Sequence, residues 1–104
     1  VVLFKINQTK VDPYQGVNIY NIARYLKDNP QFKVRVIGYT DRKTGTSQIN
    51  EKLSAERAQN VARILISDYN ISRDRIKVEW VGAKEPPFDK PEWNRGVILY
   101  VEQE

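Results

Sequence analysis

The sequence contains no cysteine and no histidine. Without cysteine, the chain cannot form a disulfide or a thiolate metal site. Without histidine, it lacks the commonest general base and the commonest metal ligand. Serine and lysine show no recognisable catalytic spacing. Catalysis by a pair of carboxylates remains an alternative, because Asp41, Glu51 and Glu56 can approach one another in a fold. We therefore expect a protein that is not an enzyme and that uses no catalytic residue, metal or cofactor.

Long apolar runs are also missing. The longest, Val97 to Val101, is strand-sized and far below the ~20 residues that span a bilayer. The chain does not begin with a basic stretch, an apolar core and a small-residue cleavage site, so no signal peptide is visible. The first residues already read as a strand. We expect a domain excised from a longer protein, with its export signal or anchor upstream and no membrane insertion of its own.

The charge balance is basic but diffuse. Seventeen Lys and Arg against thirteen Asp and Glu give +4, which favours acidic partners such as nucleic acid, anionic lipid or a carboxylate-rich polymer. The basic residues are spread along the chain, and no motif places stacking aromatics at fixed positions. The stretch GYTDRKTG also lacks the glycine–lysine–hydroxyl ending of a phosphate loop. Net charge is thus the main support for a nucleic-acid-binding module, and this hypothesis is weak.

Length and composition predict one globular domain over residues 1–104, since the chain is 40% hydrophobic and 29% charged. Alternating apolar residues predict strands over 1–6, 32–39, 75–82 and 96–102. Apolar residues at helical spacing predict helices from Asp12 to about residue 28, and from Asn50 or Ser54 to about residue 70. The order βαβαββ indicates an α+β fold, a sandwich of one mixed sheet with both helices on one face.

Local signals support the first helix. Asp12 can cap it, Pro13 suits its first position, and Gln15 stands in capping-box register. Trp80 lies in a predicted strand and Trp93 in a proline-rich loop. We expect Trp80 to pack in the core and Trp93 to anchor the loop, with contact to a ligand as the alternative.

The stretches VIGYTD and INEKLSAERAQNVARIL, with a glycine between them and Asn-Arg before the last strand, resemble the OmpA-like domain. That family has the pattern Gly-His-Thr-Asp, a loop with Gly, Asn-x-x-Leu-Ser-x-x-Arg-Ala and a late Asn-Arg-Arg. The matching residues stand in order along nearly the whole chain: Gly38, Thr40, Asp41, Gly45, Asn50, Leu53, Ser54, Arg57, Ala58, Asn94 and Arg95. Tyr39 replaces the His, Gly96 replaces the second late Arg, and the loop before the helix is about one residue longer.

The resemblance implies a βαβαββ fold and a ligand, the stem peptide of peptidoglycan held at its diaminopimelate residue. It implies that Asp41 and Arg57 hold that residue. The chemistry agrees, because diaminopimelate presents an ammonium and a carboxylate at one stereocentre, which suit Asp and the forked donors of Arg. Exchange of Asp41 or Arg57 for alanine is then expected to abolish binding while the protein stays folded.

The remaining ligand-binding residues expected from the resemblance are Thr40, Asn50, Asn7 and Arg95. Asn50, Asn7 and Arg95 each have a structural alternative. So do Asp41, as a turn residue, and Arg57, as a solvated helix charge. Asn50 can cap the helix, Asn7 can end the first strand, and Arg95 can bind loop carbonyls.

The resemblance further implies a periplasmic domain that tethers the outer membrane, or its parent protein, to the cell wall. The expected partner is peptidoglycan rather than nucleic acid. The alternative function is a general protein-interaction or nucleic-acid-binding module on the same fold. The parent protein can be a porin, a lipoprotein or a flagellar stator component. The domain can be a monomer or a homodimer.

Overall fold

The order of elements along the chain is βαβαββ, as predicted. The computed structural model describes residues 2–4, 8–40, 47–82 and 96–103. Its strands are β1 (Val2–Leu3), β2 (Phe32–Tyr39), β3 (Ile76–Gly82) and β4 (Gly96–Gln103). Its helices are α1 (Gly16–Asp28) and α2 (Ser47–Ser67), with short 3-10 turns η1 (Pro13–Gln15) and η2 (Arg73–Arg75).

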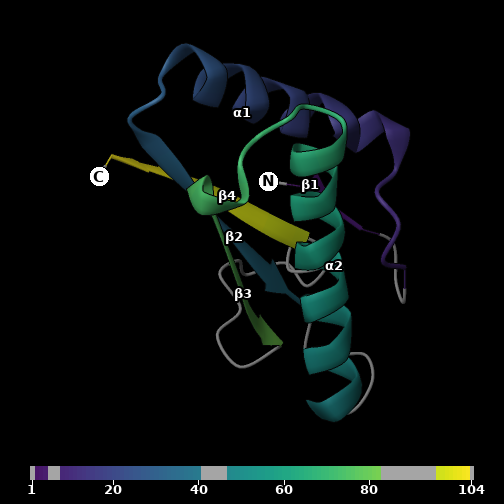
Figure 1. Cartoon of the computed structure of the whole chain (residues 1–104). Coiled ribbons are helices and arrows are strands. Elements are labelled where there is room, and N and C mark those ends of the chain that lie inside the picture. Colours follow the sequence, from purple (N-terminus) through teal and green to yellow (C-terminus); the bar gives the residue numbers. More distant parts are fainter. Residues whose placement is uncertain (1, 5–7, 41–46, 83–95, 104) are drawn as a thin grey trace.

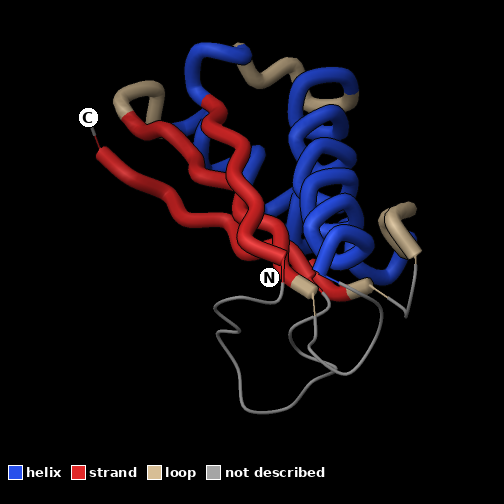
Figure 2. Tube along the Cα trace, turned by 90° about the horizontal axis from the view of Figure 1, so that it is seen from below, coloured by secondary structure: helices blue, strands red, loops and turns tan. Residues whose placement is uncertain are grey.

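The four strands form one mixed sheet in the order β1-β4-β2-β3. β2 pairs in parallel with β3, whereas β4 runs antiparallel to both β1 and β2. The last strand of the chain is therefore inserted between the first and the second. Both helices cover the same face of the sheet (Figures 1 and 2). This arrangement confirms the predicted fold class.

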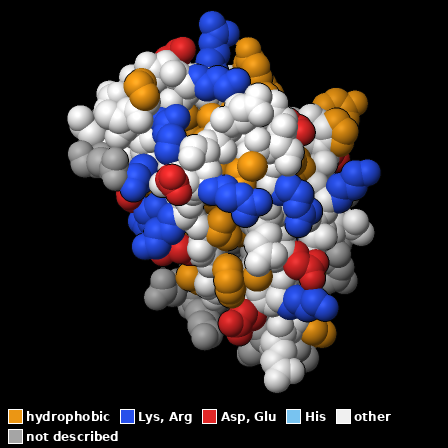
Figure 3. All heavy atoms as spheres, in the orientation of Figure 1, with side chains coloured by type: hydrophobic (Ala, Val, Ile, Leu, Met, Phe, Trp, Pro, Cys, Tyr) orange, Lys and Arg blue, Asp and Glu red, His pale blue; other side chains and the backbone are white. Residues whose placement is uncertain are grey.

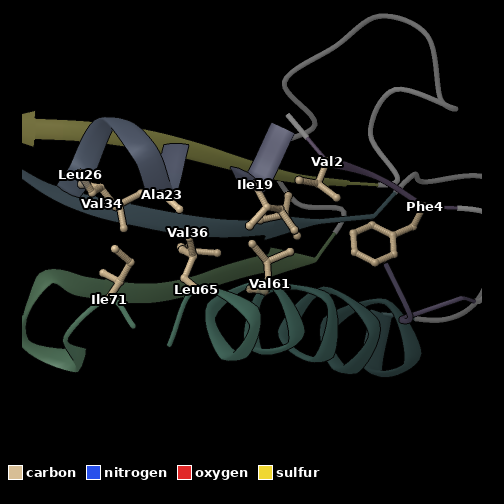
Figure 4. Close-up of a cluster of buried hydrophobic side chains, with 12 residues drawn as sticks. Val2, Phe4, Ile19, Ala23, Leu26, Val34, Val36, Val61, Leu65 and Ile71 are labelled. Atoms are coloured by element: carbon tan, nitrogen blue, oxygen red, sulfur yellow. The ribbon is translucent and has the colours of Figure 1, made fainter. Parts of the chain in front are cut away.

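The core lies between the sheet and the two helices. Val34 and Val36 of β2 are buried at alternate positions, as the strand pattern predicted. They face Leu26 from α1 and Leu65 from α2 (Figure 4). Each such side chain contributes about 1.5–3 kcal/mol when it is removed from water. The core thus fixes both helices on the sheet.

The start of the first helix agrees with its sequence signals. The Asp12 carboxylate accepts a hydrogen bond from the main-chain N–H of Tyr14 at 2.9 Å, and Pro13 occupies the first helical position. The first turn is 3-10 rather than α. The Gln15 side-chain oxygen accepts from the main-chain N–H of Leu3 at 3.2 Å, which ties this turn to β1.

Arg75 binds the end of α1, a contact that the sequence did not predict. One terminal nitrogen of its guanidinium donates to the carbonyl oxygens of Leu26, Asn29 and Phe32 at 2.7, 3.0 and 2.8 Å. The last carbonyls of a helix have no partner within the helix. Arg75 supplies a hydrogen-bond donor for these carbonyls and so joins α1, β2 and η2.

The second helix begins at Ser47, earlier than either predicted start. Asn50 and Ser54 lie inside the helix, so neither is its cap. The Ser54 hydroxyl donates instead to the Glu51 carbonyl oxygen at 2.8 Å. At the other end Asn70 adopts a left-handed conformation (φ 57°), and the Ile71 N–H donates back to the Leu65 carbonyl oxygen at 3.0 Å. A left-handed residue just after a helix is a common way for the helix to end, and asparagine and glycine are favoured there.

The sheet face away from the helices carries an ion-pair network. Arg35 donates to Glu79 at 2.9 Å and to Glu102 at 3.2 Å, and its guanidinium lies 5.9 Å from the centre of the Tyr100 ring. These residues come from β2, β3 and β4. The hydrogen bonds from Glu79 first, and then Glu102, raise the pKa of Arg35. The network joins three strands on the sheet face opposite α1 and α2.

The surface on the helix side mixes charges of both signs. Lys and Arg side chains are distributed over this face, with Asp and Glu between them (Figure 3). The basic excess read from the sequence is therefore interspersed with acidic side chains here. Within the described residues, no helix is both long and apolar enough to cross a membrane.

Candidate functional site

The carboxyl ends of β2 and β3 meet the first turns of α2 at one end of the sheet. The main-chain N–H of Thr40 donates to the Gly82 carbonyl oxygen at 2.9 Å. The Gly82 N–H in turn donates to the Ser54 hydroxyl at 3.0 Å. Two hydrogen bonds thus join the ends of both strands to the helix, and they define the floor of the candidate site.

The helix presents a row of polar side chains to this floor. Asn50, Ser54 and Arg57 are spaced by four and three residues, which places them on one face of α2. All three are buried. Polar side chains are seldom buried unless they are paired or used. Their burial separates this face from an ordinary solvated helix surface.

Arg57 is held by main-chain carbonyls from two other segments. It is only 1% exposed. Its Nε donates to the Gln8 carbonyl oxygen at 2.9 Å and its Nη1 to the Tyr39 carbonyl oxygen at 3.3 Å. The guanidinium also lies 5.2 Å from the centre of the Phe4 ring. A solvated helix charge, the structural alternative for Arg57, is therefore wrong.

Two buried polar atoms at this end of the sheet have no hydrogen-bond partner among the described residues. Thr40 is 2% exposed and Asn50 is 5% exposed. Neither the Thr40 hydroxyl nor the Asn50 side-chain oxygen has a hydrogen-bond partner within the part of the chain that the structure describes. A buried polar atom left unpaired costs about 1–3 kcal/mol. A bound water, ion or ligand group would supply the missing hydrogen bonds.

The described residues bring together Thr40, Asn50 and Arg57 of the predicted set. Asp41 follows Thr40 directly in the sequence but lies outside the described residues, as do Asn7, Arg95 and Trp93. Gly96, which replaces the family's second late Arg, begins β4 opposite Leu3. The roles expected for Asp41, Asn7 and Arg95 stay predictions.

Sequence reasoning missed the segment that leads from β1 to α1. The Gln8 carbonyl binds Arg57, and the next carbonyl, Thr9, accepts from the Asn60 side-chain nitrogen at 2.7 Å. Asn60 lies three residues after Arg57 and so on the neighbouring turn of α2. The three-residue spacing between Arg57 and Asn60 was the signal available in the sequence. Their acceptors could not be identified from it, because every residue has a main-chain carbonyl.

Asn60→Ala is expected to lower the free energy of unfolding by about 1 kcal/mol, because the hydrogen bond to the Thr9 carbonyl is lost together with an exposed bond from Arg63 that contributes little. Urea denaturation followed by circular dichroism measures this change. The matched control is Gln59→Ala, an exposed position on the same helix, which should change stability by less than about 0.5 kcal/mol. Equal stability of both variants would show that the Thr9 contact contributes nothing.

The described residues contain no group of three or more His, Cys, Asp or Glu that could hold a metal ion. The site is instead made of one cation, one amide and hydroxyls. Such a set can bind a carboxylate through Arg57 and exchange hydrogen bonds with peptide groups through Thr40 and Asn50.

Comparison with known families decides the classification, because residues 3–97 match the OmpA family. The chain belongs to the OmpA family. Among its relatives, Outer membrane protein 40 of Porphyromonas gingivalis is 46% identical over 99 residues. Those residues are 95% of this chain but 26% of that protein, so the OmpA-like sequence described here spans about a quarter of its relative's length.

Solved structures of OmpA-like domains share the fold. The peptidoglycan-associated lipoprotein from Burkholderia pseudomallei has a TM-score of 0.84 at 26% identity and covers 97% of this chain and 88% of its own. The C-terminal domain of Helicobacter pylori MotB also has a TM-score of 0.84, covering 99% and 83% of the two chains. At 19% identity, this second likeness concerns the fold alone. The family resemblance seen in the sequence is confirmed.

Trp80 departs from its expected place in the core. It stands on the helix side of the sheet, since its register partner on β2 is Gly38, whose missing side chain would point at α2. The side chain is nevertheless 41% exposed. β3 is an edge strand, so α2 does not fully cover the Trp80 side chain. The core prediction for Trp80 is therefore wrong.

Proposed function

We propose that this domain binds peptidoglycan without forming a covalent bond, and that it holds the stem peptide at its diaminopimelate residue. The supporting observation is the cluster of Arg57, Thr40 and Asn50, a buried cation beside two buried polar atoms that have no partner among the described residues. A peptide ligand supplies both a carboxylate and amide groups. The name of the Burkholderia neighbour, a peptidoglycan-associated lipoprotein, agrees with this choice of ligand.

Arg57 is suited to the carboxylate of the diaminopimelate side chain. The Gln8 and Tyr39 carbonyls hold its guanidinium in place, so little side-chain entropy is lost when an anion binds. Burial also lowers the local dielectric constant and strengthens a charge-assisted hydrogen bond. In this proposal the neighbouring ammonium group of the ligand binds the Asp41 carboxylate.

Thr40 and Asn50 are suited to the peptide groups around that centre. The Thr40 hydroxyl can donate or accept, and the Asn50 amide offers both kinds of group. Hydrogen bonds to a peptide would satisfy the Thr40 hydroxyl and the Asn50 oxygen. Asn7 and Arg95 complete the proposed set, in which Arg95 binds a second carboxylate of the stem peptide.

In the cell, the proposed role is to anchor a longer protein of the outer membrane to the wall from the periplasmic side. The relatives named above are an outer membrane protein and a peptidoglycan-associated lipoprotein. The domain would then act as a tether and would carry out no chemical reaction. The parent protein would supply the attachment to the membrane.

The test is a calorimetric titration with two stem tripeptides, one containing diaminopimelate and one containing lysine in its place. Lysine keeps an ammonium group but lacks the side-chain carboxylate, so we expect at least tenfold weaker binding of the lysine peptide. Asp41→Ala should weaken binding of the diaminopimelate peptide by about thirtyfold or more, because the ligand's ammonium group loses its charged partner.

The matched control is Asp68→Ala, an exposed aspartate just beyond the opposite end of α2, which should bind as the unaltered domain does. Equal affinity for both tripeptides would contradict the proposal. Binding to DNA that falls steeply with salt and ignores Asp41→Ala would favour the nucleic-acid alternative.

A further inference from the structure

The exposed indole of Trp80 lies close to the candidate site. Trp80 stands two residues before Gly82 on β3, and a strand rises about 3.3 Å per residue, so their Cα atoms are ~7 Å apart. Gly82 is itself part of the site floor, because it accepts from Thr40 and donates to Ser54. A side chain built on Gly82 would also lie within 3.7 Å of the Asn50 main chain.

A second exposed apolar side chain lies on the helix side of the same site. Ile49 directly precedes the buried Asn50 in the first turn of α2, and half of its surface is exposed. Large apolar side chains that stay in water next to a polar site mark a contact surface more often than isolated ones do. Ile49 and Trp80 approach the site from its two elements, the helix and the edge strand.

We propose that Trp80 stacks against a sugar ring of the glycan strand that carries the stem peptide. The inference rests on the proposed function and extends it from the peptide to the polysaccharide. One face of a hexosamine ring presents C–H groups, which pack on the face of an aromatic ring. Tryptophan offers the largest such face and a polar N–H at its rim.

The length of the stem peptide fits this placement. Diaminopimelate is the third residue from the sugar, and three extended residues span at most about 10–11 Å. This length is comparable with the distance from Gly82 in the site floor to Trp80, with the length of the Trp80 side chain added. A ligand held at Arg57 and Asn50 can therefore place its first sugar at the edge of β3.

The experiment compares two ligands, the diaminopimelate tripeptide alone and the same tripeptide on its N-acetylglucosamine–N-acetylmuramic acid disaccharide. The unaltered domain should bind the second ligand more tightly. Trp80→Ala should weaken binding of the disaccharide ligand by about five- to thirtyfold and change binding of the free tripeptide by less than twofold. Trp80→Phe keeps an aromatic ring and should retain most of the affinity.

Tyr100→Ala is the matched control, because Tyr100 is equally exposed, at 43%, on the opposite face of the sheet. It should bind both ligands as the unaltered domain does. Equal losses for both ligands in Trp80→Ala, or no loss for either, would overturn the stacking role. If the unaltered domain binds neither ligand, the proposed function is wrong and this inference falls with it. Circular dichroism verifies that each variant is folded.

Discussion

Arg57→Ala is expected to lower the free energy of unfolding by about 2–4 kcal/mol and to abolish peptide binding. The sequence alone predicted a loss of binding in a variant that stays folded, with no loss of stability specified. The structure revises this expectation, because the guanidinium is 1% exposed and donates to the Gln8 and Tyr39 carbonyls. Removing it leaves the Gln8 and Tyr39 carbonyls without a charged donor and opens a cavity next to Phe4.

Urea denaturation measures the loss of stability, and the calorimetric titration measures the loss of binding. Arg63→Ala is the control for stability, since Arg63 is an exposed arginine on the same helix whose guanidinium donates to the side-chain oxygen of Asn60 at 3.0 Å in an exposed hydrogen bond. A surface pair of this kind contributes about 0–1 kcal/mol. If Arg57→Ala were no less stable than Arg63→Ala, the contacts of Arg57 with the main chain would have no part in holding the fold.

Arg57→Lys separates the structural role of Arg57 from its role in binding. Lysine keeps the positive charge, but its compact ammonium cannot reproduce the planar fork that meets two carbonyls and a carboxylate. We expect stability between that of Arg57→Ala and the unaltered domain, with peptide affinity reduced at least tenfold. A lysine variant that binds the peptide normally would show that charge alone suffices at this position.

Gly38→Ala is expected to destabilise the domain by more than about 3 kcal/mol. A methyl group on Gly38 would fall on the Ser54 carbonyl oxygen and would lie 2.8 Å from the Ser54 carbonyl carbon. It would also meet the Cβ of Ala58 at 3.2 Å. These are largely main-chain atoms of α2, so no side-chain rotation relieves the clash. The helix must move away from β2, and core overpacking of this kind costs 1–3 kcal/mol or more.

The displacement would also affect the site, because Ser54 and Arg57 move with the helix. We therefore expect Gly38→Ala to weaken peptide binding as well, if it folds at all. Thermal unfolding by circular dichroism measures the stability. Gly16→Ala is the matched control, since a methyl group there has no atom within 4 Å and lies at the start of α1. It should be neutral or slightly stabilising. A Gly38→Ala variant as stable as Gly16→Ala would contradict the close approach of helix and strand.

Local patterns predicted the elements best where burial alternates strongly. The bounds of β2, Phe32–Tyr39, agree with the sequence, because alternating apolar and charged residues leave one consistent register. The start of α2 was predicted too late. Ser47, Gln48 and Ile49 read as a polar loop, since their helical state depends on the packing of later turns rather than on local signals.

Contacts between distant segments were beyond sequence reasoning. The insertion of β4 between β1 and β2 does not follow from the order of elements, because chain order does not specify which strands pair. Likewise the bonds of Arg57 and Asn60 go to main-chain carbonyls, which every residue possesses. Trp80 was misplaced for a related reason, since its exposure depends on how far α2 extends over the edge strand.

The sequence by itself determined the family and the α+β class, and it predicted which residues would bind a zwitterionic ligand. It could do so because those properties depend on residue type and spacing. Only the tertiary structure decided that Arg57 is buried and bound to main-chain carbonyls, and that Thr40 and Asn50 are buried with polar atoms that have no partner among the described residues. The physical reason is that burial and hydrogen-bond satisfaction are properties of an environment, which β2, β3 and α2 create only when they pack together.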